Sequence, residues 1–125
     1  MNVVDSSAWL SYFAGDRNAA VFAKAIEDEA RLLVPSITLA EVFKAILRQR
    51  GEESALTAIA HMQVGRVVPI GTELALDAAS LGLQHGLPLA DSIIFATAVQ
   101  FDATLWTQDS DFKDIPGVRY VARSK

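Results

Sequence analysis

The alternation of short apolar runs with longer helical segments is the feature of this sequence that most restricts its fold. Five short runs rich in β-branched and other apolar residues predict strands. They cover residues 2–5, 32–34, 67–70, 104–107 and 118–121. Helical patterns lie between and around them, at residues 7–14, 18–29, 36–50, 52–62, 72–85 and 89–101. Strands that alternate with helices predict a parallel sheet with helices on both faces.

Small residues mark the expected ends of several helices. Ser6 or Ser7, and later Ser36, carry hydroxyls that can cap a helix N-terminus. Gly15 and Gly86 follow two of the helices, where glycine readily ends a helix in the left-handed conformation. We therefore expect a three-layer α/β/α sandwich with a central, mainly parallel sheet of the Rossmann-like kind. In such sheets, binding sites form beyond the carboxyl ends of the strands.

The composition predicts one domain, residues 1–125, without thiol chemistry. Hydrophobic residues make up 51% of the chain, which is enough for a core. The absence of cysteine excludes disulfides and zinc–thiolate sites. Because His61 and His85 are the only histidines, one chain cannot build a three-histidine metal site. Any metal would be held by oxygen ligands, which suit Mg²⁺ or Mn²⁺.

The charge and hydropathy of the chain restrict its partners and location. A formal net charge of −4 argues against binding nucleic acid by bulk electrostatics, although an enzyme with a bound cation and a local basic patch is compatible with it. No apolar run reaches the roughly 20 residues that span a bilayer. The first residues also lack a signal-peptide pattern. We therefore expect no membrane partner and a cytoplasmic location.

Four acidic residues lie just beyond the expected strands. Asp5 ends the first strand, and Asp109 lies two residues after the fourth. Glu41 lies in the second turn of the helix that follows the second strand. Asp91 lies in the first turn of the helix that leads to the fourth. In a parallel sheet all four carboxylates can lie at one edge, but the strand order that decides this stays open.

Each of these carboxylates also has an interpretation without a function. Asp5 and Asp109 can be turn residues that accept backbone N–H groups. Glu41 can pair with Lys44 on the surface of its helix. Asp91 can cap its helix. However, Asp91 shares a helix face with the apolar residues three, four and seven positions later, and a carboxylate in such surroundings needs a partner or a cation.

If the four carboxylates converge, they fit divalent-metal chemistry. Carboxylates in one pocket repel each other and raise each other's pKa values, and a divalent cation relieves that repulsion. Mg²⁺ keeps several waters, so a few carboxylates are enough to hold it. Such a cation activates water for attack on a phosphodiester and stabilises the charge that develops on the phosphate.

Four segments, in order along the chain, resemble the motifs of PIN-domain ribonucleases. Residues 3–9, Val-Val-Asp-Ser-Ser-Ala-Trp, resemble the opening strand that ends in Asp. Residues 35–42, Pro-Ser-Ile-Thr-Leu-Ala-Glu-Val, resemble the segment with the acidic glutamate. Residues 87–94 resemble the third acidic segment, and residues 105–112 resemble the fourth, a Thr-x-Asp that ends in Asp-Phe. The resemblance spans nearly the whole chain.

The resemblance implies a PIN-like fold and a catalytic cluster of four acidic residues. Asp5, Asp91 and Asp109 would be ligands of Mg²⁺, with Mn²⁺ as the alternative ion. Glu41 would complete the catalytic set as a ligand, as a residue that holds a water, or as a base.

Two hydroxyl residues and a further acid complete the implied site. Ser7 and Thr107 would be supporting residues that orient a carboxylate or a water. Asp111 is a possible extra acid, and fixing the turn is the favoured interpretation of this residue.

Among stand-alone PIN domains, a chain of this length resembles VapC toxins of toxin–antitoxin pairs. That resemblance implies an endoribonuclease that cleaves structured RNA, forms a homodimer and is inhibited by a VapB-like antitoxin inserted into its groove. Trp9, Tyr12 and Phe13 form a candidate docking area, although we expect Trp9 and Phe13 to belong to the core. Arg48 and Arg50 are candidate phosphate contacts, with ordinary solvated arginines as the simpler interpretation.

Other functions of similar sheets fit the sequence less well. A phosphatase of the haloacid-dehalogenase type needs an Asp two positions after Asp5, where this chain has Ser7. A receiver domain needs an Asp at the end of the third strand, where this chain has Pro69, Ile70 and Gly71. The remaining alternative is a non-catalytic PIN-like domain that binds RNA or protein. Loss of acidic positions would support it, and all four are present.

Overall fold

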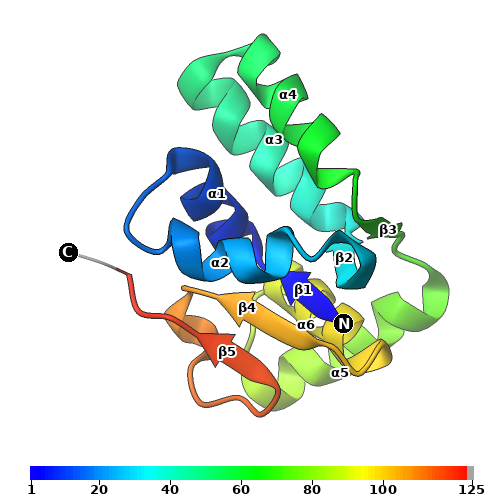
Figure 1. Ribbon diagram of the computed structural model, residues 1–125. Helices are drawn as coiled ribbons and strands as arrows, with labels where there is room; N and C mark the ends of the chain where they lie inside the picture. The colour runs from blue at the N-terminus through cyan, green and yellow to red at the C-terminus, as the bar shows by residue number, and fades with distance from the viewer. Residues whose placement is uncertain (124–125) are drawn as a thin grey trace.

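Five strands form one sheet between two layers of helices (Figure 1). The structure, a computed structural model, describes residues 1–123. The strands are β1 (Asn2–Val4), β2 (Leu32–Pro35), β3 (Arg66–Val68), β4 (Thr104–Thr107) and β5 (Val118–Tyr120). The helices are α1 (Ser6–Ala14), α2 (Ala19–Ile26), α3 (Ser36–Arg50), α4 (Glu52–Met62), α5 (Thr72–His85) and α6 (Leu89–Gln100). Short 3₁₀ helices lie at η1 (Glu29–Arg31) and η2 (Ser110–Phe112).

The order of the strands places a crevice at the middle of the sheet. The order is β3-β2-β1-β4-β5, and every pair of neighbours is parallel. From β1 the chain builds outward to β2 and β3, then crosses through α5 and α6 to β4 on the other side of β1. The direction of winding therefore reverses between β1 and β4. At such a reversal the connections leave in opposite directions and open a crevice at the carboxyl ends of the strands.

The predicted three-layer arrangement is confirmed, and two predicted element ends differ from the observed ones by more than one residue. The third strand ends at Val68 rather than at residue 70, because Pro69 has no N–H to donate to a neighbouring strand. The second helix ends at Ile26 rather than at residue 29. Asp28 leaves the helical conformation there, with φ −87° and ψ 68°, and the chain tightens into η1.

The predicted serine caps were wrong, whereas the glycine ends are confirmed. Asp5 and Pro35 occupy the N-cap positions, and Ser6 and Ser36 are the first residues of their helices. Gly15, at φ 64°, ends its helix in the left-handed conformation that costs glycine little. Because Ser6 does not cap the helix, its hydroxyl is available for another hydrogen bond, which is described below.

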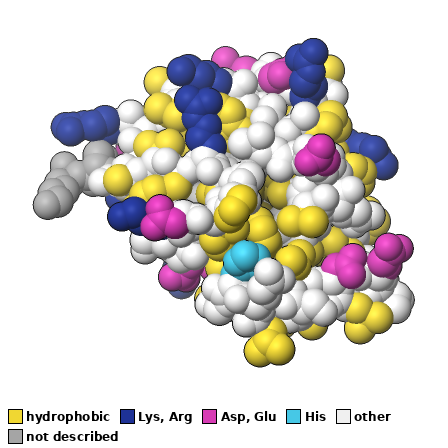
Figure 2. Space-filling view, turned by 90° about the horizontal axis from the view of Figure 1, so that it is seen from below, with side chains coloured by type: hydrophobic (Ala, Val, Ile, Leu, Met, Phe, Trp, Pro, Cys, Tyr) yellow, Lys and Arg dark blue, Asp and Glu magenta, His cyan; other side chains and the backbone are white. Residues whose placement is uncertain are grey.

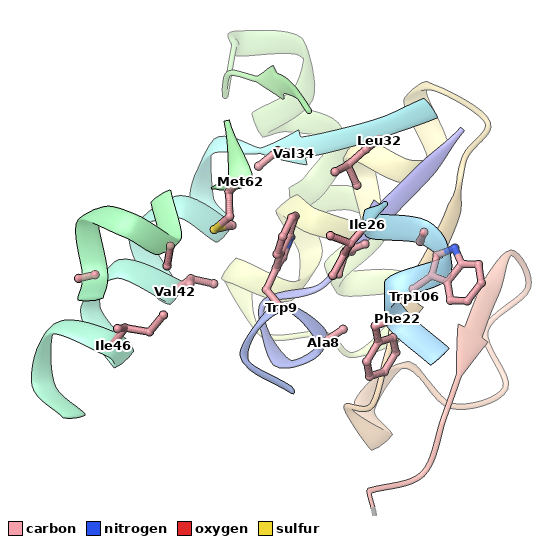
Figure 3. Packing of buried hydrophobic residues seen from close by; sticks show 14 residues of the cluster. Ala8, Trp9, Phe22, Ile26, Leu32, Val34, Val42, Ile46, Met62 and Trp106 are labelled. Atoms are coloured by element: carbon pink, nitrogen blue, oxygen red, sulfur yellow. The ribbon is translucent and has the colours of Figure 1, made fainter. Parts of the chain in front are cut away.

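Successive residues of the strands point to opposite faces and build two hydrophobic layers. On one face, Val4 and Trp106 pack with α1 to α4. Figure 3 shows Trp9 in the middle of this cluster, between Met62 and Ile26. The pair α3 and α4 extends beyond the sheet as a helical hairpin (Figure 1).

The opposite face of the sheet is covered by α6, and α5 packs on α6. Val3 and its strand neighbours contact the buried side of α6, which includes Ile94 and Phe95. From Ser92 to Ala98 every residue of α6 is buried, because the sheet lies on one side and α5 on the other. The N-terminus of α6 is therefore rigidly placed, and Asp91 with it.

The outer face of α5 carries exposed apolar side chains. Leu76 and Leu83 of α5 and Leu89 at the start of α6 are all largely exposed. Figure 2, which views the molecule from below Figure 1, shows hydrophobic side chains on this side among scattered charges. No helix in residues 1–123 combines the length and apolar character needed to cross a membrane.

The close packing of α5 on α6 predicts a destabilising substitution. A Cβ added at Gly82 would overlap the Ser92 hydroxyl, next to Asp91. Overpacking of this kind costs about 1–3 kcal/mol, so Gly82→Ala should lower the free energy of unfolding by about that amount in urea titrations. Gly71→Ala is the matched control, because a Cβ there meets nothing within 4 Å. Equal stability of the two variants would contradict the prediction.

Candidate active site

Asp5 follows β1 directly and lies buried at the crevice. Its N–H donates to the carbonyl oxygen of Trp106 at 2.9 Å, which continues the pairing of β1 with β4. Its side chain is 3% exposed. Oδ2 accepts hydrogen bonds from the Ser7 hydroxyl at 2.7 Å and from the Thr107 hydroxyl at 2.8 Å. Both hydroxyls expected to orient a carboxylate therefore contact the same oxygen.

Burial is the main influence on the ionisation of Asp5. It raises the pKa of the Asp5 carboxyl above 3.8, because an ionised group loses its hydration in the interior. The hydrogen bonds from Ser7 and Thr107 act in the opposite direction, and the charge of Asp109 raises the pKa again. The two hydroxyls thus hold a carboxylate whose surroundings disfavour its charge.

Glu41 lies on α3 and faces the same crevice. Its Oε1 accepts a hydrogen bond from the Ser6 hydroxyl at 2.7 Å, although the two residues are 35 positions apart. The surface pair with Lys44 is not formed, since the one ion pair within residues 1–123 joins Arg31 to Asp28. The simple surface interpretation of Glu41 was therefore wrong.

Asp91 is the third residue of α6, and its environment is strongly acidic. Pro88 holds the N-cap position, and no side chain caps this helix, so the capping interpretation of Asp91 was wrong. The pKa of the Asp91 carboxyl is raised from 3.8 to about 7, first by burial and then by the charges of four carboxylates: Asp5, Asp109, Glu41 and Asp111. The other three carboxylates proposed from the sequence therefore all act on Asp91.

The loop after β4 contributes two carboxylates rather than one. The N–H of Asp109 donates to the Thr107 hydroxyl at 2.9 Å, and its Oδ1 accepts from the N–H of Asp111 at 2.9 Å. The turn role of Asp109 is thus present together with its place in the crevice. Carboxylate oxygens of Asp91, Asp109 and Asp111 all lie within 4.8 Å of one another.

Asp111 is the member of this group for which the sequence favoured a turn role over that of an extra acid. The short helix η2 brings it back toward Asp109. The signal was present as two acids separated by one residue, but such spacing is also common in ordinary turns. Asp5 lies outside the group of three, although its charge acts on Asp91.

The donor set fits a hard divalent cation. Every candidate ligand is a carboxylate oxygen, the type that Mg²⁺ and Mn²⁺ prefer. Within residues 1–123 no lysine or arginine forms an ion pair with this cluster. Repulsion between neighbouring carboxylates contributes to the raised pKa of Asp91. A bound cation would relieve this repulsion.

A groove of about 900 Å³ connects the carboxylates to the helical hairpin. Asp5, Glu41, Asp91 and Asp109 line one part of it. A second part is walled by apolar side chains of α1, α3 and α4: Leu10, Phe13, Ala14, Ile46 and Ala58. The groove is thus acidic at one place and apolar at another.

Two arginines line this groove, and one of them was expected. Arg50, at the end of α3, lies in the lining, whereas Arg48 is exposed elsewhere on the same helix. Arg123, beyond β5, is the second, and the sequence analysis did not select it.

The aromatic residues of α1 divide between core and groove. Trp9 is fully buried, as expected of a core residue, and stacks on Phe13 with ring centroids 5.6 Å apart. Phe13 is partly buried and lines the groove. Tyr12 donates a hydrogen bond to Glu27 at 3.2 Å and is not among the groove residues. Of the three, Phe13 alone meets the groove.

The comparison with protein families identifies the group to which the chain belongs. A sequence model of the PIN domain matches residues 3–118. The chain belongs to the PIN domain family. A search of curated protein sequences found no significant match.

Among the solved structures that resemble this PIN domain are a toxin–antitoxin complex and a toxin. A toxin–antitoxin complex from Klebsiella pneumoniae contains a chain 26% identical, with a TM-score of 0.78 over 95% of this chain and 96% of that chain. VapC20 of Mycobacterium tuberculosis, a toxin that cleaves the sarcin-ricin loop, is 21% identical, with a TM-score of 0.75 over 90% and 92%. VapBC-1 of nontypeable Haemophilus influenzae is 21% identical, with a TM-score of 0.66 over 97% and 96%.

The raised pKa of Asp91 predicts how pH acts on this PIN domain without metal. The folded state keeps the Asp91 proton up to a pKa of about 7, whereas the unfolded chain releases it near 3.8. Because the folded state binds the Asp91 proton more tightly than the unfolded chain does, protonation of Asp91 favours the folded state. This stabilisation is complete below pH 3.8 and is lost as the pH rises through about 7. Asp91→Asn, which cannot ionise, should therefore melt above the wild type at roughly pH 8, with a smaller difference at roughly pH 5. Thermal melts in EDTA measure both, and a difference independent of pH would refute the assignment.

Proposed function

We propose that this PIN domain is a Mg²⁺-dependent endoribonuclease that acts as the toxin of a VapBC-type toxin–antitoxin pair. The observation that carries the proposal is the set of acidic residues around the crevice, where burial and then the neighbouring carboxylate charges raise the pKa of Asp91 to about 7. The PIN family assignment and the neighbouring toxin structures support the same function. No observation favours the non-catalytic alternative, because all four carboxylates line one groove.

Different residues of the site would have different roles in a metallonuclease. Asp91 and Asp109 would hold the cation, with Asp111 beside them and Asp5 at the base of the crevice. When bound, Mg²⁺ supplies positive charge that stabilises the phosphate and makes a water more acidic. Glu41, held by the Ser6 hydroxyl, is suited to accept a proton from an attacking water.

RNA is the substrate class that the proposal names. VapC20, which shares the fold, cleaves the sarcin-ricin loop. The groove of this chain is open to solvent, and Arg50 and Arg123 are among its lining residues. Two local cations in a chain of net charge −4 are suited to contact phosphates along the groove without bulk attraction.

An antitoxin protein is the partner that the proposal names. Similar folds occur in a toxin–antitoxin complex from Klebsiella pneumoniae and in VapBC-1 of Haemophilus influenzae. In this chain the apolar wall formed by Leu10, Phe13 and Ile46 continues from the acidic site, so one inserted segment can cover both. The homodimer and the cytoplasmic location stay predictions.

Metal-dependent cleavage of RNA is the first test. Purified, partner-free protein should cut total RNA at discrete sites with Mg²⁺ or Mn²⁺ and not with EDTA. Asp5→Asn and Asp91→Asn should each lower the rate by about 100-fold or more, because each removes a carboxylate charge that would help to hold the cation at the phosphate. Asp102→Asn makes the same chemical change at an exposed turn before β4 and should keep full activity. Cleavage that survives in both site variants would overturn the residue assignment, and no cleavage by folded wild type would favour the binding domain.

From the position of Arg50 in the groove, we expect its charge to contribute to the salt dependence of RNA binding. In an Asp91→Asn background, Arg50→Ala should weaken binding of a single-stranded RNA and reduce the slope of log K against log salt by about 0.7, the value for one lost phosphate contact. Arg48→Ala is the control, because Arg48 lies on the same helix outside the groove. Filter binding across a salt series measures both slopes. Equal slopes for the two variants would remove Arg50 from the proposed interface.

A further inference from the structure

Two buried amide side chains lie next to the segments that carry the acidic site, and one of them, Gln108, also lines the groove. Gln108 is 7% exposed and Asn18 is 8% exposed. Gln108 separates Thr107 from Asp109 in the loop after β4, and Asn18 precedes α2. Neither was selected from the sequence, because an isolated Asn or Gln carries no pattern. A buried amide is retained only where its hydrogen bonds are met, so its partners show what it holds in place.

The contacts of Gln108 fasten the β4 loop to the first turn of α1. Its side-chain Nε2 donates to the carbonyl oxygen of Ser7 at 3.2 Å. Its backbone N–H donates to the Ser7 hydroxyl at 3.4 Å. Ser7 is therefore held at both its backbone and its side chain. The same Ser7 hydroxyl donates to Oδ2 of Asp5, so the position of Gln108 bears on the position of that carboxylate.

The contacts of Asn18 hold Gln108 in turn. Asn18 Nδ2 donates to Gln108 Oε1 at 3.0 Å and to the carbonyl oxygen of Ala122 at 3.0 Å. Both hydrogens of the Asn18 amide are thus used. The second bond ties the segment after β5, where Arg123 follows, to the same point.

These bonds join parts of the chain that no local structure connects. Asn18 and Gln108 are 90 positions apart, and Gln108 and Ser7 are 101 apart. On the other side of Gln108, Asp109 donates its N–H to Thr107, whose hydroxyl bonds to Asp5. The amide pair therefore lies where the Asp5 and Asp109 segments are joined.

We infer that Asn18 and Gln108 are positioning residues that set the separation between Asp5 and Asp109 across the groove. The inference rests on the proposed function, since it assigns the pair to the same metal site. Neither amide touches the metal ligands' carboxylate oxygens, so their effect passes through Ser7 and through the backbone of the β4 loop. Residues that orient metal ligands typically change metal affinity by about 10–100-fold when they are replaced.

The test measures binding of Mn²⁺ alone, by calorimetry, to folded protein without RNA. Gln108→Met keeps the length of the side chain and removes its side-chain hydrogen bonds while the backbone bond to Ser7 remains, and Asn18→Leu removes the side-chain hydrogen bonds of its partner. Each should weaken Mn²⁺ binding by about 10-fold or more. Because Asn18 acts through Gln108, the double variant should lose no more affinity than Gln108→Met alone.

A matched control separates positioning from a general loss of stability. Thr97→Val removes a buried hydroxyl that donates to the carbonyl oxygen of Ile93 at 2.8 Å, away from the acidic site. It should lower the melting temperature as the amide variants do and leave Mn²⁺ affinity unchanged. If Gln108→Met does not fold, Gln108→Asn is measured instead, because it keeps a polar amide but is too short for both contacts.

The outcomes separate this inference from the proposed function. Weaker Mn²⁺ binding in the amide variants, with Thr97→Val like the wild type, supports the inference. Wild-type affinity in folded Gln108 and Asn18 variants overturns it and leaves the metallonuclease proposal standing. Wild-type protein that binds no Mn²⁺ overturns both. Equal losses in Thr97→Val and in the amide variants assign the effect to stability and overturn the inference alone.

Discussion

The burial of one carboxylate between two neighbouring strands is the constraint on which the rest of the site depends. Asp5 continues β1 beside β4, and its side chain is almost without contact with water. A buried carboxylate is unfavourable unless hydroxyls or N–H groups satisfy it, and the two hydroxyls that do so come from either side of the crevice, at Ser7 and Thr107. Because the Thr107 hydroxyl also accepts the N–H of Asp109, the loop after β4 takes its course from the same interaction.

Without a bound cation, the acidic site destabilises the folded protein. Ionised carboxylates near Asp91 repel each other, and no ion pair among the described residues offsets them there. The burial of the two hydrophobic layers offsets this repulsion, with Trp9 at the centre of one layer and the buried residues 92–98 of α6 in the other. A cation that binds only the folded state would stabilise the fold in proportion to its concentration and affinity. Function and stability are thus linked through the same few charges.

The local pattern of apolar residues predicted the fold well. The features that it did not predict depend on contacts between residues far apart in the sequence. Apolar periodicity places strands and helices, and the alternation implies a parallel sheet, so Glu41 and Asp109 were expected at the correct edge. The sequence does not encode locally which distant polar groups meet. The Ser6 bond to Glu41 spans 35 positions, and the bond from Asn18 to Gln108 spans 90. Such contacts depend on strand order and helix docking, which one sequence without its relatives leaves open.

Because β4 lies next to β1 at the site, the site can form only after β4 has been synthesised. A nascent chain leaves the ribosome from its N-terminus, so β1, β2 and β3 emerge well before β4. Until then Asp5 lacks Thr107, and the carboxylates of residues 109 and 111 do not yet exist. The groove therefore cannot be complete before residue 111 of 125 has been made. The proposed nuclease would therefore lack part of its metal-binding carboxylate set until β4 and the residues after it have been synthesised.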